Sequence, residues 1–165
     1  MEIAIRPAEM KDMSALTAIL NWHIEHDHAS FFCNQLATEA SQVEVLKTCG
    51  GPYQWWVAEC GGEVIGSSKS KQYRQGEIYA ATVETGLCLH PDYLGRGIGS
   101  LLYSHLLQHL HGWDVHLALA GIAIPNPASV ALHRKFGFKE VGVFEEYAKV
   151  KGSYFSSLWM QKYIE

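Results

Sequence analysis

The 165-residue chain lacks both a long apolar run and a terminal segment of the secretory type. No apolar stretch approaches the roughly 20 residues that a membrane-spanning helix needs. Neither end combines a charged start, an apolar run and a small-residue cleavage site. We therefore expect a cytoplasmic protein that has no membrane partner.

An excess of basic residues is also missing. The chain has 13 Lys and Arg against 17 Asp and Glu, so its formal net charge is −4. Nucleic-acid affinity comes largely from clustered Lys and Arg that displace counterions. This balance argues against a nucleic-acid partner and favours a small molecule.

A third absence is a cysteine pattern typical of disulfide scaffolds or zinc sites. No CxxC pair occurs among the four cysteines, Cys33, Cys49, Cys60 and Cys88, so we expect free thiols. Histidines at helical spacing can bind zinc only with a further ligand and a shaped cavity. We therefore interpret the groups at positions 23, 26 and 28 and at positions 105, 109 and 111 as solvated helix ends, and expect no metal.

What the chain does contain is an alternation of strand-like and helix-like patterns, without repeats. Its length and 48% hydrophobic content suit one core, so one domain over residues 1–165 is expected. Helical spacing of apolar residues begins near Asp12, Thr38, Ile98 and Pro127, and two strand-like runs flank Gly61-Gly62. The pattern predicts an α/β fold in the order βααβββαβαββ, a mixed central sheet of about seven strands with about four helices.

The segment HPDYLGRGIGSLL, residues 90–102, places glycines at positions 95, 97 and 99 between a predicted strand and a predicted helix. Such glycines let backbone N–H groups converge, and the helix start adds partial positive charge, which suits an anion such as pyrophosphate. A P-loop is excluded because no Lys-Ser/Thr pair follows the last glycine, and the spacing differs from the dinucleotide fingerprint. A tight turn with its helix cap stays open as the alternative.

The stretch VETGLCLHPDYLGRGIGSLLYSHLL resembles the acyl-CoA-binding motif of the GNAT N-acetyltransferases, and IPNPASVALHRKFGFKEVG resembles their second signature. With IRPAEMKDMSAL at the start, the resemblance covers nearly the whole chain and implies the GNAT fold with acetyl-CoA as co-substrate. It implies that the backbone of Leu87, Cys88 and Leu89 pairs with the pantetheine arm of CoA. Further cofactor contacts are implied for the loop, which would hold the pyrophosphate, and for the second signature: Gly95, Arg96, Gly97, Ile98, Gly99, Ser100, Asn126 and Ser129.

Two positions qualify this assignment. Leu94 stands where the family has Arg or Gln, so phosphate binding is expected to rely on backbone N–H groups. Asn126 can alternatively be an ordinary helix-entry residue that satisfies free backbone N–H groups.

The stretches NWHIEHDHASFF and YAATVETGLCL resemble the phosphinothricin and related amino-acid N-acetyltransferases. This implies direct acetyl transfer, within a ternary complex, to the primary amine of a small acceptor of the phosphinothricin or methionine sulfone and sulfoximine type. It also implies a homodimer. An ammonium must lose a proton before it can attack, and Glu84 matches the family's glutamate that takes this proton. The alternative reading of Glu84 is an exposed strand carboxylate.

The same resemblance gives roles to three more residues. His133 can give a proton to the departing CoA thiolate, because an imidazole titrates near neutrality, or it can merely line the cofactor channel. Arg74 can pair with an acidic group of the acceptor. Phe31 can supply an apolar wall.

The chain departs from these relatives at Ala80, at Ser156 and over residues 27–30. Other acceptors therefore stay open, among them a polyamine, an antibiotic and a peptide N-terminus. A non-catalytic acyl-CoA-binding domain is the alternative from a different class. The presence of both Glu84 and His133 at motif positions favours the enzyme.

Overall fold

The computed structural model describes residues 2–27 and 33–165. Within these residues, seven strands and four α-helices follow one another in the predicted order, which confirms the predicted fold class. The strands are β1 (Ile3–Pro7), β2 (Trp55–Cys60), β3 (Glu63–Gln72), β4 (Thr82–Leu89), β5 (Leu117–Ile124), β6 (Lys139–Val150) and β7 (Ser153–Tyr163). The helices are α1 (Met13–His26), α2 (Glu39–Lys47), α3 (Ile98–Leu110) and α4 (Pro127–Lys135).

Local signals in the sequence fix several element ends. The Thr38 hydroxyl caps α2 by accepting a hydrogen bond from the Ser41 N–H at 3.1 Å. Pro127 occupies the first turn of α4, where a missing N–H costs nothing. Gly61 and Gly62 join β2 to β3 with φ values of 59° and 86°, which favour glycine.

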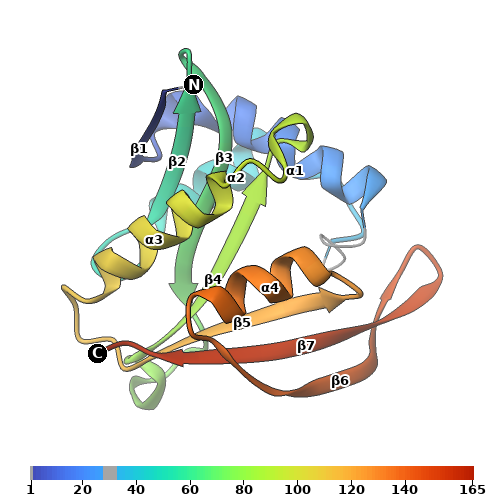
Figure 1. Ribbon diagram of the computed structural model, residues 1–165. Helices are drawn as coiled ribbons and strands as arrows, with labels where there is room; N and C mark the ends of the chain where they lie inside the picture. The colour runs from blue at the N-terminus through green and yellow to red at the C-terminus, as the bar shows by residue number, and fades with distance from the viewer. Residues whose placement is uncertain (1, 28–32) are drawn as a thin grey trace.

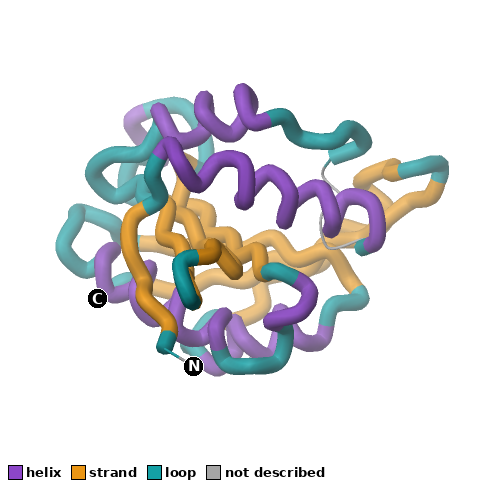
Figure 2. The backbone as a smooth tube through the Cα atoms, turned by 90° about the horizontal axis from the view of Figure 1, so that it is seen from above, coloured by secondary structure: helices purple, strands orange, loops and turns teal. Residues whose placement is uncertain are grey.

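All seven strands of the described chain form one sheet in the order β1-β2-β3-β4-β5-β7-β6. Seen from above, this sheet lies between two layers of helices (Figure 2). Helices α1 and α2 pack on one face, and α3 and α4 cover the other (Figure 1). Among residues 2–27 and 33–165, no helix has the length and apolar character needed to cross a bilayer.

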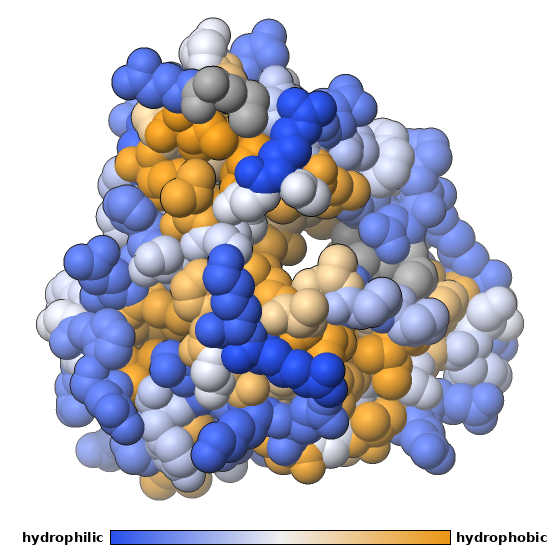
Figure 3. Space-filling view, viewed as in Figure 1, coloured by the Kyte–Doolittle hydropathy of each residue, from blue (hydrophilic) through white to orange (hydrophobic). Residues whose placement is uncertain are grey.

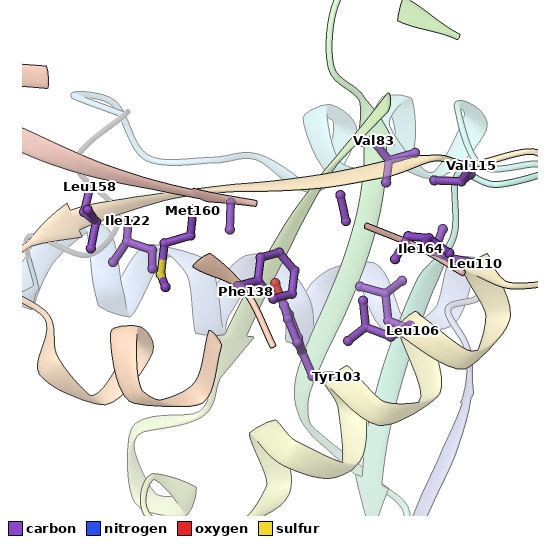
Figure 4. Close-up of a cluster of buried hydrophobic side chains, with 13 residues drawn as sticks. Val83, Tyr103, Leu106, Leu110, Val115, Ile122, Phe138, Leu158, Met160 and Ile164 are labelled. Atoms are coloured by element: carbon purple, nitrogen blue, oxygen red, sulfur yellow. The ribbon is translucent and has the colours of Figure 1, made fainter. Parts of the chain in front are cut away.

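The main core lies between α3 and the sheet. Tyr103, Leu106 and Leu110 recur at helical spacing on α3, and none of them is exposed to solvent. They pack against buried side chains of several strands, including Val83 and Met160. Figure 4 shows Tyr103 reaching from α3 into this cluster.

Arg6 attaches the start of α1 to the sheet. Its guanidinium donates two hydrogen bonds of 2.8 Å to the carboxylate of Asp12 and bonds of 2.9 and 2.7 Å to Glu59 in β2. Burial would raise the pKa of Asp12, but the hydrogen bonds from Arg6 and the nearby backbone outweigh it, so this pKa is lowered. The carboxylate therefore stays charged and paired at neutral pH.

Strands β4 and β5 run side by side only where they begin. They are parallel and pair at Thr82–Leu117, Val83–Ala118 and Glu84–Leu119. Beyond these pairs they diverge (Figure 1), while β4 stays bonded to β3 and β5 to β7. In the described sheet, each strand thus has an inner edge whose backbone groups have no neighbouring strand and can bind a ligand.

Candidate active site

A cleft of about 560 Å³ lies between the diverging strands. Its walls come from the second halves of β4 and β5, the glycine loop with the first turn of α3, and the start of α4. The space-filling view shows the molecule hollowed between the end of β4 and α4 (Figure 3). The volume lies within the roughly 300–1,000 Å³ of small-molecule sites.

The three loop glycines serve two different purposes. Gly95 and Gly97 have φ values of 71° and 80°, in the left-handed region where a side chain is strained. Gly97 is the N-cap of α3, so the first N–H groups of the helix, which have no partner within the helix, lie next to it and can bind an anion. At Gly99 a Cβ would lie only 3.1 Å from Leu87 Cδ2, so glycine lets the helix start lie close against β4.

Most of the residues predicted to contact the cofactor line this cleft. They are Leu87, Cys88, Leu89, Gly95, Gly97, Gly99, Ser100, Asn126 and Ser129. Two do not: Ile98 is buried in the core, and Arg96 is exposed, with its guanidinium 5.3 Å from the Tyr93 ring centroid. Asn126 also caps α4, because its side chain accepts a hydrogen bond from the Ser129 N–H at 3.2 Å. This is the helix-entry role considered in the sequence analysis as the alternative to a CoA contact.

Two basic residues contact the cleft wall. Lys135 was not identified from the sequence, and the interpretation of His23 as a solvated helix end is wrong, because His23 is buried and lines the cleft. Lys135, at the end of α4, donates a hydrogen bond of 2.9 Å to Ser100 Oγ and so places a positive charge at the start of α3. His23, on α1, bonds to the carbonyl oxygen of Leu89 at 2.7 Å, and its other ring nitrogen lies 3.3 Å from Asp27. Both contacts join elements that are distant in sequence, so local patterns could not reveal them.

Glu84 lies where β4 and β5 separate. It is the last β4 residue that pairs with β5, and its side chain is 22% exposed. Lys71 stands opposite it in β3, with Nζ 3.5 Å from Glu84 Oε1. A second lysine of β3, Lys69, also lines the cleft, and burial lowers its pKa. Neither lysine was predicted as a site residue.

His133 lines the cleft from the α4 side and is held at both ring nitrogens. Nδ1 donates to the carbonyl oxygen of Ser129 at 2.7 Å, and Nε2 lies 2.7 Å from the Tyr103 hydroxyl. That hydroxyl also lies 2.6 Å from Thr85 Oγ1. A carbonyl only accepts, so the proton sits on Nδ1, and in the neutral ring Nε2 accepts from Tyr103. Burial lowers the pKa of His133, despite the opposing effect of Ser129, and so favours this neutral form.

Glu84 and His133 approach the cleft from opposite faces of the sheet. Successive strand residues point to opposite faces, and Thr85 contacts Tyr103 on the α3 side. Glu84 therefore points to the face that α1 and α2 cover. The cleft runs between the separated strands and connects a carboxylate on one face with an imidazole on the other.

The remaining predicted residues do not join this constellation. Arg74 is exposed, lies 5.2 and 5.8 Å from the ring centroids of Tyr73 and Tyr79, and is not among the residues that line the cleft. Phe31 lies outside the described residues. Burial raises the pKa of the Cys88 thiol to about 12, so this thiol stays protonated at neutral pH. In the described part of the chain, no three His, Cys, Asp or Glu side chains form a group that could hold a metal ion.

Comparison with known proteins points to one family. The model described as "Acetyltransferase (GNAT) family" matches residues 10–138. A phosphinothricin N-acetyltransferase of Streptomyces coelicolor is 36% identical over 164 residues, covering 98% of this chain and 96% of that protein. An L-methionine sulfoximine/L-methionine sulfone acetyltransferase of Salmonella typhimurium is 27% identical, covering 99% of this chain and 95% of that protein.

Solved structures are similar over the same length. An acetyltransferase of Salmonella typhimurium with its cofactor acetyl-CoA has a TM-score of 0.94 at 26% identity, covering 100% of this chain and 95% of that one. A GNAT superfamily phosphinothricin acetyltransferase of Sinorhizobium meliloti in complex with acetyl-CoA has a TM-score of 0.92 at 26% identity, covering 99% and 89%.

The buried contacts of Tyr103 are expected to stabilise the fold. Tyr103→Phe removes the hydroxyl shared by Thr85 and His133, so it should lower the free energy of unfolding by about 1–3 kcal/mol. Tyr163, which is 55% exposed, provides the matched Tyr163→Phe control, expected within about 0.5 kcal/mol of the parent. Urea denaturation measures both, and equal changes would contradict the buried contact.

The ionisation of His133 gives a second test. In the native protein the ring should be the neutral Nδ1–H tautomer at pH 7, with a pKa below the ordinary value of about 6.5. Its stabilising contribution is then complete above about pH 6.5 and is lost as pH falls through the lowered folded-state pKa. Long-range proton–nitrogen NMR distinguishes the forms. An imidazolium or an Nε2–H tautomer at pH 7 would show that the deduced hydrogen bonds are wrong.

Proposed function

Because the chain belongs to the Acetyltransferase (GNAT) family, we propose that it acetylates the primary amine of a small amino-acid-like acceptor by direct transfer within a ternary complex. Membership of this family confirms the predicted GNAT fold and the prediction of an N-acetyltransferase that uses acetyl-CoA. Relatives named for phosphinothricin and for methionine sulfoximine and sulfone support an amino-acid-like acceptor. The observation that carries the proposal is the cleft that Glu84 and His133 line from opposite faces of the sheet.

The residues of the cleft fit acetyl-CoA. The pantetheine arm contains amide groups, and the inner edge of β4 offers the backbone groups of Leu87 and the N–H of Leu89 as partners for them. The Leu89 carbonyl already bonds to His23, and the backbone of Cys88 faces β3. The pyrophosphate needs converging N–H groups and positive charge, and the start of α3 with Lys135 provides both. Acetyl-CoA supplies the acetyl group as an activated thioester.

Glu84 is proposed to take the proton of the acceptor ammonium, directly or through one water. A carboxylate at this position can act because it lies at the mouth of the gap between β4 and β5 and is partly exposed. Loss of the proton exposes the nitrogen lone pair that forms the new bond to the acetyl carbon.

His133 is proposed to act on the opposite side, where the sulfur leaves. Hydrogen bonds with Ser129 and Tyr103 hold the ring in one orientation, so little entropy is lost in positioning it for the reaction. Burial favours the neutral ring, so His133 must first take up a proton and release Nε2 from Tyr103 before it can donate to the leaving sulfur. Without that change its role is to line the cofactor channel.

Two substitutions test these roles. Glu84→Gln and His133→Gln should each lower kcat by about 10²–10⁴, the usual contribution of general acid–base catalysis, and leave the Kd for acetyl-CoA unchanged. The assay follows CoA release with a panel of amino acids and polyamines, corrected for hydrolysis. Glu77→Gln and His116→Gln are matched controls because both residues are exposed and neither lines the cleft.

The outcomes separate the candidate functions. If the parent chain binds acetyl-CoA but acetylates none of the amines, it is an acyl-CoA-binding domain and the proposed enzyme is wrong. If the parent chain is active and Glu84→Gln retains full kcat, the enzyme stands but the base is another group.

The proposed enzyme is a cytoplasmic, single-domain homodimer. The edge strand β6 supports dimerisation, because it exposes a row of apolar side chains: Val141 (60%), Val143 (48%) and Phe144 (57%). Exposed apolar edges of this kind are typical of pairing surfaces.

Sedimentation at micromolar concentration tests the dimer. The parent chain should sediment as a dimer, and Phe144→Asp should shift it toward the monomer by placing a charge in the contact. Leu101→Asp on α3, at a residue that is also exposed (47%), should leave the dimer intact. A monomeric parent chain would show that this part of the proposal is wrong.

A further inference from the structure

Two lysines lie on the same face of the sheet as Glu84. In the antiparallel pairing of β3 with β4, Lys69 stands opposite Gly86 and Lys71 stands opposite Glu84. Directly opposed residues share a face, and residues two apart on one strand do so as well. Both lysines line the cleft from the side that α1 and α2 cover.

Lys69 is a positive charge without an anionic partner. In residues 2–27 and 33–165 its ammonium makes no hydrogen bond or ion pair, and it lies 5.1 Å from the centroid of the Trp55 ring. Trp55 is 4% exposed, and its buried indole N–H also has no acceptor in this part of the chain. Removing the unpaired Lys69 ammonium from water is unfavourable, and an anion that enters the cleft would offset this cost, since Lys69 lines the cleft whereas Trp55 does not.

Lys71 is held only loosely by Glu84. Their separation of 3.5 Å is longer than an ordinary charged hydrogen bond, and the Lys71 side chain is 56% exposed. Lys71 is therefore free to turn toward a ligand. Formally, the two lysines outnumber Glu84, and the other carboxylate of the cleft lining, Asp27, lies 3.3 Å from His23 Nδ1.

We propose that Lys69 and Lys71 form an anion-binding subsite for the acceptor, so that the acceptor carries a carboxylate or similar acidic group close to its amine. Such an acceptor gives its ammonium proton to the Glu84 side and presents its anionic group to the two lysines. A polyamine would bring a second positive charge to the same lysines and is disfavoured. This inference rests on the proposed acetyl transfer and narrows its substrate class.

The subsite takes the role for which the sequence suggested Arg74. Arg74 is exposed beside two aromatic rings and is absent from the cleft lining, whereas the lysines line the cleft that contains Glu84.

The experiment compares acceptors that differ only in the acidic group. L-methionine sulfone is measured beside its primary amide and beside the amine in which hydrogen replaces the carboxylate. For the parent chain, kcat/KM should fall roughly 10- to 100-fold when the carboxylate is lost, as expected for a hydrogen bond to a charged group. Lys69→Met and Lys71→Met should lower kcat/KM for the acid by a similar factor and leave that for the amide nearly unchanged.

Matched variants control for folding and for general charge effects. Lys47→Met removes an exposed lysine of α2 that pairs with Glu44 outside the cleft, and it should retain the parent preference. Lys69→Arg keeps the charge and should restore most of the preference that Lys69→Met loses. An unchanged Kd for acetyl-CoA shows that each variant is folded.

Failure of the subsite differs from failure of the enzyme. If the parent chain acetylates acid and amide equally well, acetyl transfer stands and the subsite is wrong. If no amine is acetylated, calorimetry with N-acetyl-L-methionine sulfone and its amide replaces the kinetics. A preference for the acid that Lys69→Met abolishes then supports the subsite, and equal binding overturns it.

Discussion

The short pairing between β4 and β5 is the constraint on which the site depends. Three residue pairs join the two strands, and the divergence begins immediately after Glu84 and Leu119. The gap leaves backbone groups of both strands available to a ligand, and it creates the cleft that α3 and α4 close from one side. A fully paired sheet would satisfy those backbone groups internally and would separate Glu84 from His133 by a continuous layer.

This geometry divides the chemistry between the two faces of the sheet. On the α3 and α4 face lie the N–H groups of the helix start, Lys135 and the His133–Tyr103–Thr85 contacts, all suited to the donor and its leaving sulfur. On the α1 and α2 face lie Glu84 and the lysines of β3, suited to an acceptor that has both an amine and an anion. Because each group of residues is supported by different helices, acceptor preference can change without altering the cofactor end.

Local patterns in the sequence were enough to predict the element order, the glycine loop and the strand that ends beyond Glu84. Each of these features depends on residues close together in the chain, namely glycines at turns, helix-capping residues and the periodic spacing of apolar residues. The alternation SSKSKQ likewise places Lys69 and Lys71 on one face of their strand. Which face that is depends on the register with β4, and no local pattern contains this information. The hydrogen bonds of Tyr103 to Thr85 and His133 are hidden for the same reason, since they join two helices to a strand.

Amide hydrogen exchange with and without acetyl-CoA tests most directly whether the divergent strands form the binding site. Added acetyl-CoA should slow exchange at Leu87 and Leu89, whose N–H groups face the inner edge of β4, and at residues 98–100 at the start of α3, because these N–H groups would then be bonded to the ligand. Exchange at Arg6, Trp22 and Glu59, which line a separate groove between α1 and strands β1 to β3, should not change. Protection at that groove, with unchanged exchange along β4 and α3, would contradict the assignment of the cleft.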